Sequence, residues 1–275
     1  MRRNITKVFE VKNHEPSLLP DGDWKLVWAD EFDGETLDDS KWDYRLSMMG
    51  LKHPAWTDKG VHLDGKSNCV FTLLEEDGRP VSSQLQTGYN FMDEPVQKTT
   101  FGEDHLQWNI GKLKENKFAH KYGYFECRCK LQQMPGWWSA FWIQSPIIGA
   151  SLDPKVTGSE IDIMESFEPG EIAAHNAFTG GYGLDMKREM VGGKSNLSLD
   201  EFHRFGLRWD ENGYTFYIDG EEDGHISTYV SGCPQFILIS TEPIGYRFKD
   251  HQPTKEAKAA VGDQFIVDYV RVFEL

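Results

Sequence analysis

At the centre of the chain stands the stretch Glu160-Ile161-Asp162-Ile163-Met164-Glu165, in which acidic and apolar residues alternate over the first four positions. This is the period of a β-strand with one polar and one apolar face, so Glu160 and Asp162 share a face. Strict alternation places Glu165 on the opposite face, but one extra residue in a β-bulge at Ile163-Met164 returns it beside the other two acids. Three carboxylates on one strand face repel each other and are costly to desolvate, so the pattern indicates chemistry rather than stability.

The spacing of the two glutamates predicts a type of reaction. With one residue absorbed by the bulge, Glu160 and Glu165 lie about four strand steps apart, or ~13 Å between Cα atoms. Side chains that lean toward each other reduce this to roughly 5–6 Å between carboxyl groups, near the ~5–5.5 Å of retaining glycosidases and below the ~6.5–9.5 Å of inverting ones. The alternative is that the acids only form a solvated strand face without a function. This fits poorly, because the acids follow a tryptophan-rich run, Trp137-Trp138-Ser139-Ala140-Phe141-Trp142-Ile143.

The remainder of the chain is predicted to be all-β. From Trp24 onward, short β-rich runs alternate with turn residues, and Asn212-Gly213 and Asp219-Gly220 are hairpin signals. Helical periodicity is confined to a turn near residues 254–260. Many short strands with turns between them predict a β-sandwich or jelly roll.

We expect a polar N-terminal arm over residues 1–22 and one catalytic domain over residues 23–275. Two segments, 90–107 and 242–262, lack strand character and are long for connections. Loops of that length in a sandwich tend to form functional rims, so we expect them beside the binding cleft.

The composition excludes several classes of protein. A formal net charge of −15 repels phosphate backbones and anionic membranes, so we expect no nucleic-acid or membrane partner. The same charge weighs mildly against a heavily sulfated substrate, unless a local basic pocket overrides it. Four cysteines are too few for a disulfide scaffold, and we expect buried free thiols.

The N-terminus has a basic start but no apolar run of secretory length, and no stretch is long enough to span a membrane. We expect a cytoplasmic protein if Met1 is the native start, and a secreted one if a signal peptide was removed. We also expect a monomer.

The order of several motifs resembles glycoside hydrolase family 16, the group of laminarinases, agarases, porphyranases and carrageenases. The resemblance covers most of residues 24–275 and is carried, besides the acidic stretch, by Leu26-Val27-Trp28-Ala29-Asp30-Glu31-Phe32-Asp33-Gly34, Tyr122-Gly123-Tyr124-Phe125-Glu126-Cys127-Arg128, Pro135-Gly136-Trp137-Trp138, Phe216-Tyr217-Ile218-Asp219-Gly220 and Val267-Asp268-Tyr269-Val270-Arg271-Val272-Phe273.

The resemblance implies a concanavalin A-like β-jelly roll, whose concave sheet forms a glycan cleft, and a retaining mechanism. By position, it implies that Glu160 is the nucleophile and Glu165 the acid/base, with Asp162 between them. From its place on the strand, we expect Asp162 to form a hydrogen bond with the nucleophile and orient it. The six-residue, bulged form is that of the laminarinase and agarase branches. We expect the charges of Glu160 and Asp162 to raise the pKa of Glu165, so that it holds a proton near neutral pH.

Further residues are candidates for contacts with sugar. Trp138 and Trp142 lie four residues apart on one strand face, where either stacking on a sugar or core packing is open. Trp56 and Trp108 flank irregular segments, and we expect them to be exposed in the cleft. His175 lies near Glu165 if its strand pairs back on the catalytic strand, and Glu242 follows an apolar strand into the cleft.

We therefore predict a retaining endo-β-glycosidase acting on a polysaccharide, with β-1,3-glucan as the leading substrate. An endo-β-galactanase acting on agar-, porphyran- or host-type chains is the enzymatic alternative, and a non-catalytic carbohydrate-binding jelly roll is the alternative of another class. No cofactor is expected for the reaction. The resemblance implies a structural calcium on the convex face, with Glu31 and Asp268 as its candidate ligands.

Overall fold

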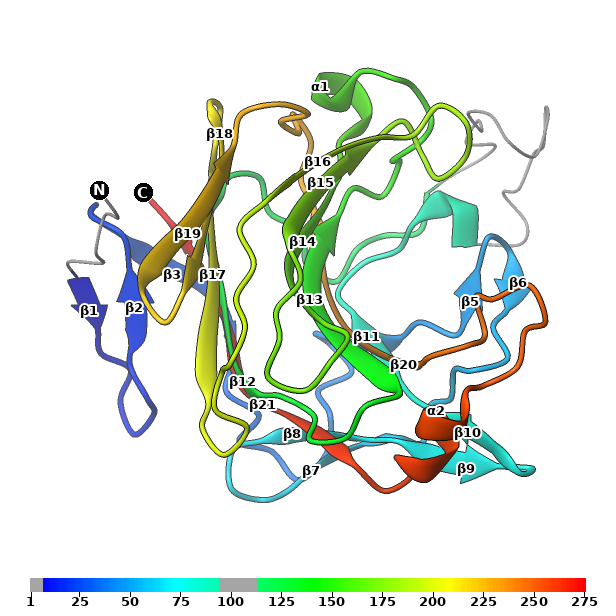
Figure 1. The fold of residues 1–275 in the computed structure, drawn as a ribbon. Helices are drawn as coiled ribbons and strands as arrows, with labels where there is room; N and C mark the ends of the chain where they lie inside the picture. Colours follow the sequence, from blue (N-terminus) through cyan, green and yellow to red (C-terminus); the bar gives the residue numbers. More distant parts are fainter. Residues whose placement is uncertain (1–6, 94–112) are drawn as a thin grey trace.

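The computed structural model describes residues 7–93 and 113–275 and contains two large antiparallel β-sheets packed face to face (Figure 1). The predicted β-sandwich of the jelly-roll class is confirmed. Among the described residues, helix is limited to short turns, and none of these helices has the length and apolar character needed to cross a membrane.

The seven-stranded sheet carries the acidic stretch. Its strands are, in spatial order, β16 (Lys187–Val191), β15 (His175–Thr179), β14 (Glu160–Ser166), β13 (Trp137–Gln144), β20 (Phe236–Pro243), β11 (Gln84–Gln86) and β4 (Asp43–Tyr44). The acidic strand β14 is flanked on both sides, so its acids project from a supported sheet and not from an edge.

The eight-stranded sheet forms the opposite layer. Its strands are, in spatial order, β19 (Glu221–Ile226), β18 (Gly213–Ile218), β17 (His203–Asp210), β12 (Gly123–Lys130), β21 (Gln264–Glu274), β8 (Cys69–Thr72) and β7 (Val61–Leu63), and β3 (Lys25–Asp30) also pairs with β21. Both hairpin signals are confirmed, since they connect β17 to β18 and β18 to β19. Asp219 and Gly220 both have positive φ, as a tight primed turn requires.

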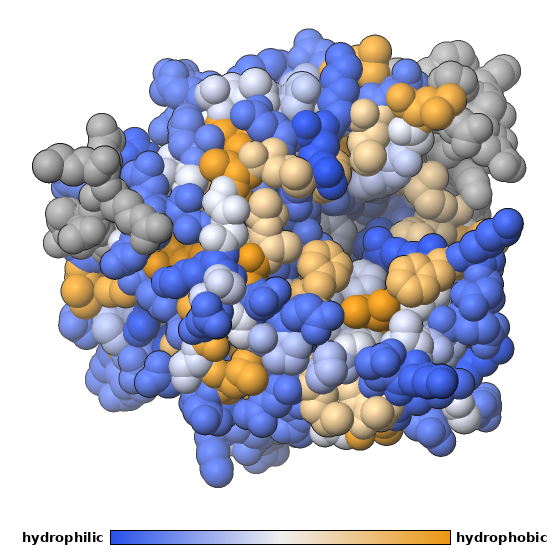
Figure 2. All heavy atoms as spheres, in the orientation of Figure 1, coloured by the Kyte–Doolittle hydropathy of each residue, from blue (hydrophilic) through white to orange (hydrophobic). Residues whose placement is uncertain are grey.

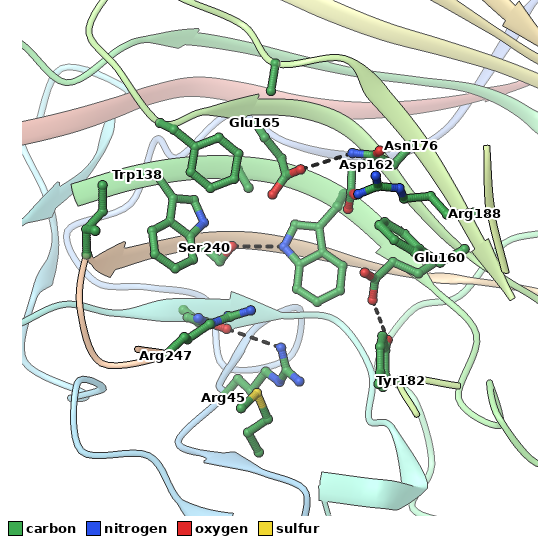
Figure 3. A pocket seen from close by; sticks show the side chains of 18 of the residues that line it. Arg45, Trp138, Glu160, Asp162, Glu165, Asn176, Tyr182, Arg188, Ser240 and Arg247 are labelled. Carbon is green, nitrogen blue, oxygen red and sulfur yellow. Dashed lines mark hydrogen bonds between the residues drawn. The ribbon is translucent and has the colours of Figure 1, made fainter. Parts of the chain in front are cut away.

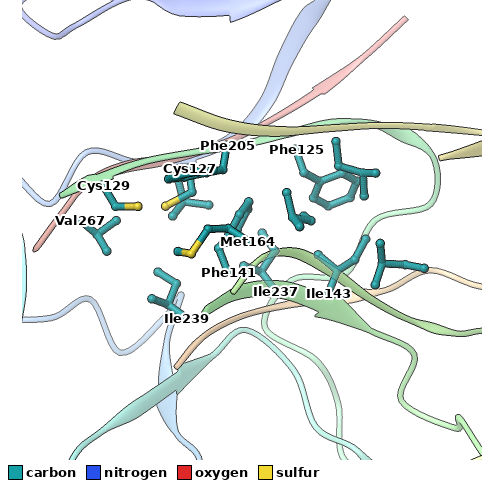
Figure 4. Close-up of a cluster of buried hydrophobic side chains, with 14 of the residues drawn as sticks. Phe125, Cys127, Cys129, Phe141, Ile143, Met164, Phe205, Ile237, Ile239 and Val267 are labelled. Carbon is teal, nitrogen blue, oxygen red and sulfur yellow. The ribbon is translucent and has the colours of Figure 1, made fainter. Parts of the chain in front are cut away.

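The main core lies between the two sheets and is built from alternate residues of both (Figure 4). Phe141 and Met164 of the seven-stranded sheet face Cys127 and Cys129 of the eight-stranded one, and all four are fully buried. All four cysteines are free thiols, as expected, although Cys233 is only partly buried. The apolar side chains of each strand therefore form the core between the sheets. The alternate side chains of the seven-stranded sheet face outward.

Smaller elements join or flank these sheets. They are β1 (Lys7–Phe9), β2 (Ser17–Leu19), β5 (Ser47–Met48), β6 (Leu51–Lys52), β9 (Leu74–Glu76), β10 (Arg79–Val81), the 3₁₀ turn η1 (Phe91–Asp93), α1 (Pro154–Thr157) and α2 (Lys255–Ala259). Helix α2 confirms the helical turn predicted near residues 254–260, and Thr254 caps its N-terminus.

The N-terminal arm packs across the eight-stranded sheet. Its strands β1 and β2 pair as a hairpin, and the backbone N–H of Leu18 donates to the buried carboxylate of Glu126 at 3.1 Å. Buried Arg271 donates to the hydroxyl of Ser17 at 2.9 Å. These contacts place the arm on the side of the sandwich that is remote from the acidic strand (Figure 1).

Candidate active site

A β-bulge in β14 brings the three acids onto one face. Along β13, Gln144 pairs with Glu160, Trp142 with Asp162, and Ala140 with Glu165, so the acids stand opposite every second residue of the partner strand. Ile163 is the extra residue, because Phe141 pairs with Met164 and the register shifts between Phe141 and Trp142. The predicted bulge is confirmed at the predicted dipeptide.

The acids line a pocket of about 800 Å³ on the outward face of the seven-stranded sheet. Figure 2 shows the surface hollowed between the side of β14 and the side of β5 and β6. Aromatic and thioether side chains surround the opening: Met48, Met49, Phe167, Met190 and Phe248. The pocket thus combines apolar walls with charged and polar groups that can orient a ligand.

Two neighbours hold Glu160. The amide of Gln144 donates to Glu160 Oε2 at 2.7 Å, and the hydroxyl of Tyr182 donates to the same oxygen (Figure 3). Asn90 in turn donates to the amide oxygen of Gln144 at 3.0 Å and fixes its orientation. Burial raises the pKa of Glu160, while these two hydrogen bonds and the charges of nearby arginines oppose the rise.

Burial also raises the pKa of Glu165, to about 7, and the negative charge of Glu160 is the next cause. The rise itself agrees with the expectation, but the largest cause is desolvation, and the hydrogen bond from Asp162 acts in the opposite direction. Asp162 has a pKa well above its usual range because it is buried beside two other acids. Asp162 and Glu165 therefore keep their protons to higher pH than exposed carboxyls do.

Asp162 contacts the acid/base candidate, not the nucleophile candidate. Its hydrogen bonds involve Glu165 and Asn176, and Asn176 also donates to Glu165 Oε2 at 3.3 Å. The sequence predicted that Asp162 orients Glu160, but the hydrogen bonds that reach Glu160 come from Gln144 and Tyr182.

Comparison with known proteins places this site in a family. The model of the glycosyl hydrolases family 16 matches residues 54–232, a span that contains all three acids. The chain belongs to glycosyl hydrolase family 16.

Relatives of the chain include the glucan endo-1,3-beta-glucosidase A1 of Niallia circulans, which is 25% identical over 272 residues. That alignment covers 90% of this chain but only 38% of the Niallia protein, so the chain spans about two fifths of that relative. The glucan endo-1,3-beta-glucosidase of Cryptopygus antarcticus is 26% identical, with 91% of this chain and 92% of that protein covered. The crystal structure of a laminarinase from Flavobacterium sp. UMI-01 shares the fold, with a TM-score of 0.63, 22% identity, and coverage of 91% of this chain and 100% of that one.

Within this family 16 site, Trp138 and Trp142 both line the pocket, as their spacing allowed. Trp138 is partly exposed, and the guanidinium of Arg247 lies 5.1 Å from its ring centroid. Trp142 is nearly buried, and its indole N–H donates to the hydroxyl of Ser240 at 2.9 Å. Trp138 therefore offers a ring to a ligand, while Trp142 forms much of the pocket floor.

The prediction that His175 lies in the cleft is wrong. His175 is buried on the core face of β15, where its ring stacks on Phe216 of the opposite sheet with centroids 4.4 Å apart. Because side chains alternate along a strand, its neighbour Asn176 takes the pocket-facing position opposite Asp162.

The expectation of an exposed Trp56 is also wrong. Trp56 is buried, stacks on His53 and donates its indole N–H to Glu242 Oε2 at 3.1 Å. Glu242 is itself fully buried and binds Arg247 through both carboxylate oxygens, at 2.9 and 2.8 Å. Glu242 therefore does not line the cleft and instead holds Arg247 at the pocket wall. Trp108 lies outside the described residues.

Sequence reasoning missed the residues that reach the pocket from distant loops. Arg45 lies within 5.4 Å of the ring centroids of both Trp56 and Trp142, and it pairs with Asp93 at 2.8 Å. Tyr182 and Arg247 arrive from connections after β15 and β20. Their sequence neighbourhoods carry no periodic signal, although residue 247 lies in one of the segments predicted to form a rim.

The residues proposed for calcium do not fit that ion. Asp268 is engaged by Arg128 at 2.6 Å, and both carboxylate oxygens of Glu31 bind Arg271. Among residues 7–93 and 113–275, no cluster of histidine, cysteine and acidic side chains is arranged to hold a metal.

Proposed function

We propose that this protein is a retaining, endo-acting glycoside hydrolase that cleaves internal β-linkages of a polysaccharide by double displacement. The observation that carries the proposal is the bulged strand β14, which presents Glu160 and Glu165 together on the floor of a pocket large enough for sugar units. The membership in family 16 supports the same reaction class.

In the first step, a carboxylate oxygen of Glu160 attacks the anomeric carbon and forms a glycosyl ester. The bond to the leaving oxygen breaks, and that oxygen takes the proton of Glu165. In the second step, Glu165 removes a proton from water, the water oxygen attacks the same carbon, and Glu160 leaves as a carboxylate. Two inversions retain the β configuration.

The surroundings of the two glutamates suit these roles. Gln144, Tyr182 and the charges of Arg45 and Arg247 favour the ionised form of Glu160, which is the form that attacks. Burial raises the pKa of Glu165 to about 7, so the protonated form that the first step needs is available near neutral pH. When the ester forms, the charge of Glu160 disappears, so the pKa of Glu165 falls and Glu165 becomes a suitable base.

A β-1,3-glucan is the substrate that the relatives support best, since two of them are named as glucan endo-1,3-beta-glucosidases. The partly exposed ring of Trp138 adds an aromatic surface on which the apolar face of a sugar can stack.

The deciding experiment measures new reducing ends with laminarin, lichenan, agarose and porphyran. Cleavage of laminarin with a ladder of oligosaccharide products supports the proposal. Cleavage of only the two galactans transfers the assignment to an endo-β-galactanase, and binding without cleavage of any glycan leaves a carbohydrate-binding jelly roll. On the cleaved glycan, NMR of the first-formed product tests the mechanism, which requires the β-anomer to appear first.

A further inference from the structure

Several basic side chains stand close to the acidic strand in the pocket. The protein has 44 acidic and 29 basic residues, yet three arginines line the pocket, Arg45, Arg188 and Arg247 (Figure 3). Outside the acidic strand, Asp93 is the single acid among the pocket-lining residues that the structure describes. The three arginines thus stand beside four acids, Asp93 and the three carboxyls of β14, and each arginine can be asked which acid it serves.

Two of these arginines have partners that explain them. Arg45 pairs with Asp93 at 2.8 Å, and Arg247 pairs with the buried Glu242 at 2.8 Å. Both also lower the pKa of Glu160, so they help to keep that carboxylate charged. The contacts of Arg45 and Arg247 with acids of the site therefore account for their positions.

No comparable contact with an acid among the described residues accounts for the position of Arg188. It is exposed on the edge strand β16, and no ion pair connects it to another residue within the described part of the chain. Its guanidinium lies 5.8 Å from the ring centroid of Phe178, which also lines the pocket. A cation therefore lies beside an aromatic wall of the pocket.

The sheet places Arg188 on one row with the proposed nucleophile. Glu160 pairs with Phe178, and Phe178 pairs with Arg188, so two strand spacings, ~10 Å, separate the backbones of Glu160 and Arg188. A sugar attacked at Glu160 therefore leaves Arg188 within reach of a neighbouring sugar of the same chain.

An exposed arginine on an edge strand also has a simpler explanation, since charged residues protect edges against pairing with other chains. In β16 the adjacent Lys187 provides such a charge, and alternation directs Lys187 to the opposite face, away from the pocket lining. Edge protection requires a charge on β16 but does not require it on the pocket side.

We propose that Arg188 recognises an anionic substituent, a sulfate ester or a carboxylate, on a sugar next to the one that is attacked. A guanidinium binds both groups through two parallel N–H···O bonds, and such charge-assisted bonds are stronger than those between neutral groups. This inference rests on the proposed glycosidase function and specifies its substrate class. It also supplies a local positive charge, which a sulfated substrate would need on a protein with a net charge of −15.

The test compares neutral and anionic forms of the same glycan. Laminarin and agarose oligosaccharides are each used unmodified, sulfated and carboxymethylated, with the wild type, Arg188→Gln and the matched control Lys187→Gln. We expect Arg188→Gln to lower the ratio of kcat/KM for the anionic form over the neutral form by about tenfold, which corresponds to ~1.4 kcal/mol. We expect Lys187→Gln to leave that ratio unchanged. Comparison of the sulfated with the carboxymethylated form shows which of the two anionic groups Arg188 recognises.

The outcomes separate this inference from the proposed function. If laminarin is cleaved and the ratio is the same in the wild type and Arg188→Gln, the inference is overturned and the hydrolase assignment stands. If only the galactan series is cleaved and the ratio depends on Arg188, the β-1,3-glucan assignment fails and the inference stands. If nothing is cleaved, calorimetric binding of the same glycans is compared, and the absence of an Arg188-dependent difference overturns the inference. An equal loss in Lys187→Gln also overturns it, because the effect would then be one of overall charge.

Discussion

The Nδ1–H of His175 donates to the backbone carbonyl of Ile163 at 2.7 Å. Ile163 is the residue that the bulge adds to β14, so it has no partner in β13. A buried carbonyl without a hydrogen bond is costly, and His175 provides one to Ile163 from the core side. The histidine thus stabilises the bulge that turns Glu165 toward Glu160, although it does not reach the pocket itself.

His175→Gln should lower kcat per folded molecule by about tenfold or more, because the bulge loses its support and Glu165 shifts relative to Glu160. The pH profile should shift as well, since the pKa of Glu165 depends on its distance from Glu160. His203→Gln is the control, because His203 is also buried and pairs with Asp219, but on the opposite sheet. Thermal melts and kinetics on both variants decide the matter: a loss of stability alone in His175→Gln would contradict the positioning role.

Glu160→Gln should abolish formation of the glycosyl ester and reduce the rate by several orders of magnitude, while glycan binding is largely kept. The reason is that an amide is a poor nucleophile but has nearly the same shape and keeps contact with Gln144 and Tyr182. Steady-state kinetics and calorimetric binding measure the two effects. Retention of more than about a tenth of the wild-type activity, ~1.4 kcal/mol of barrier, would show that another group attacks.

The activity should fall as the pH rises above about 7, because Glu165 must carry a proton and its pKa is about 7. A pH profile of kcat/KM measures this basic limb. A profile that stays flat up to pH 9 would rule out Glu165 as the acid.

Stability should change with pH for the same reason. The folded pKa of Glu165 is raised from 4.5 to about 7, so the folded state binds more protons than the unfolded state between those values. The associated stability is present below pH 4.5 and is lost as the pH rises through 7. Glu165→Gln should remove this loss and be more stable than the wild type at pH 8 by about 1–3 kcal/mol, from ~1.36 kcal/mol per pKa unit. Urea unfolding at pH 5 and pH 8 checks the sign, and equal destabilisation at both pH values would contradict it.

Trp138 and its neighbour Trp137 form a matched pair on opposite faces of β13. Trp138→Ala should reduce kcat/KM with little effect on the melting temperature, because its ring lines the pocket. Trp137→Ala should cost on the order of 3–5 kcal/mol of stability, because its ring is fully buried in the main core. Kinetics per folded molecule and thermal melts separate the two. A large drop in melting temperature for Trp138→Ala with unchanged kinetics would remove it from the binding surface.

The sequence alone determined the features that depend on local periodicity. Alternation placed Glu160 and Asp162 on one face, and the one-residue mismatch before Glu165 predicted the bulge. The turn residues Asp219-Gly220 predicted a hairpin, because few residues adopt the positive φ that such a turn needs. These signals arise from residues within a few positions of each other, so no knowledge of the fold is required to read them.

Only the tertiary structure decided which distant residues reach the site. The face on which His175 lies depends on the register in which β15 pairs with β14, and a slip of one residue would exchange it with Asn176. Trp56 is buried, and Glu242, 186 positions away, accepts its indole N–H. Arg188 faces the pocket because β16 pairs with β15 in the register that aligns it with Phe178. Such contacts follow from long-range strand pairing and packing, whose free energy is spread over many residues and leaves no local pattern in the sequence.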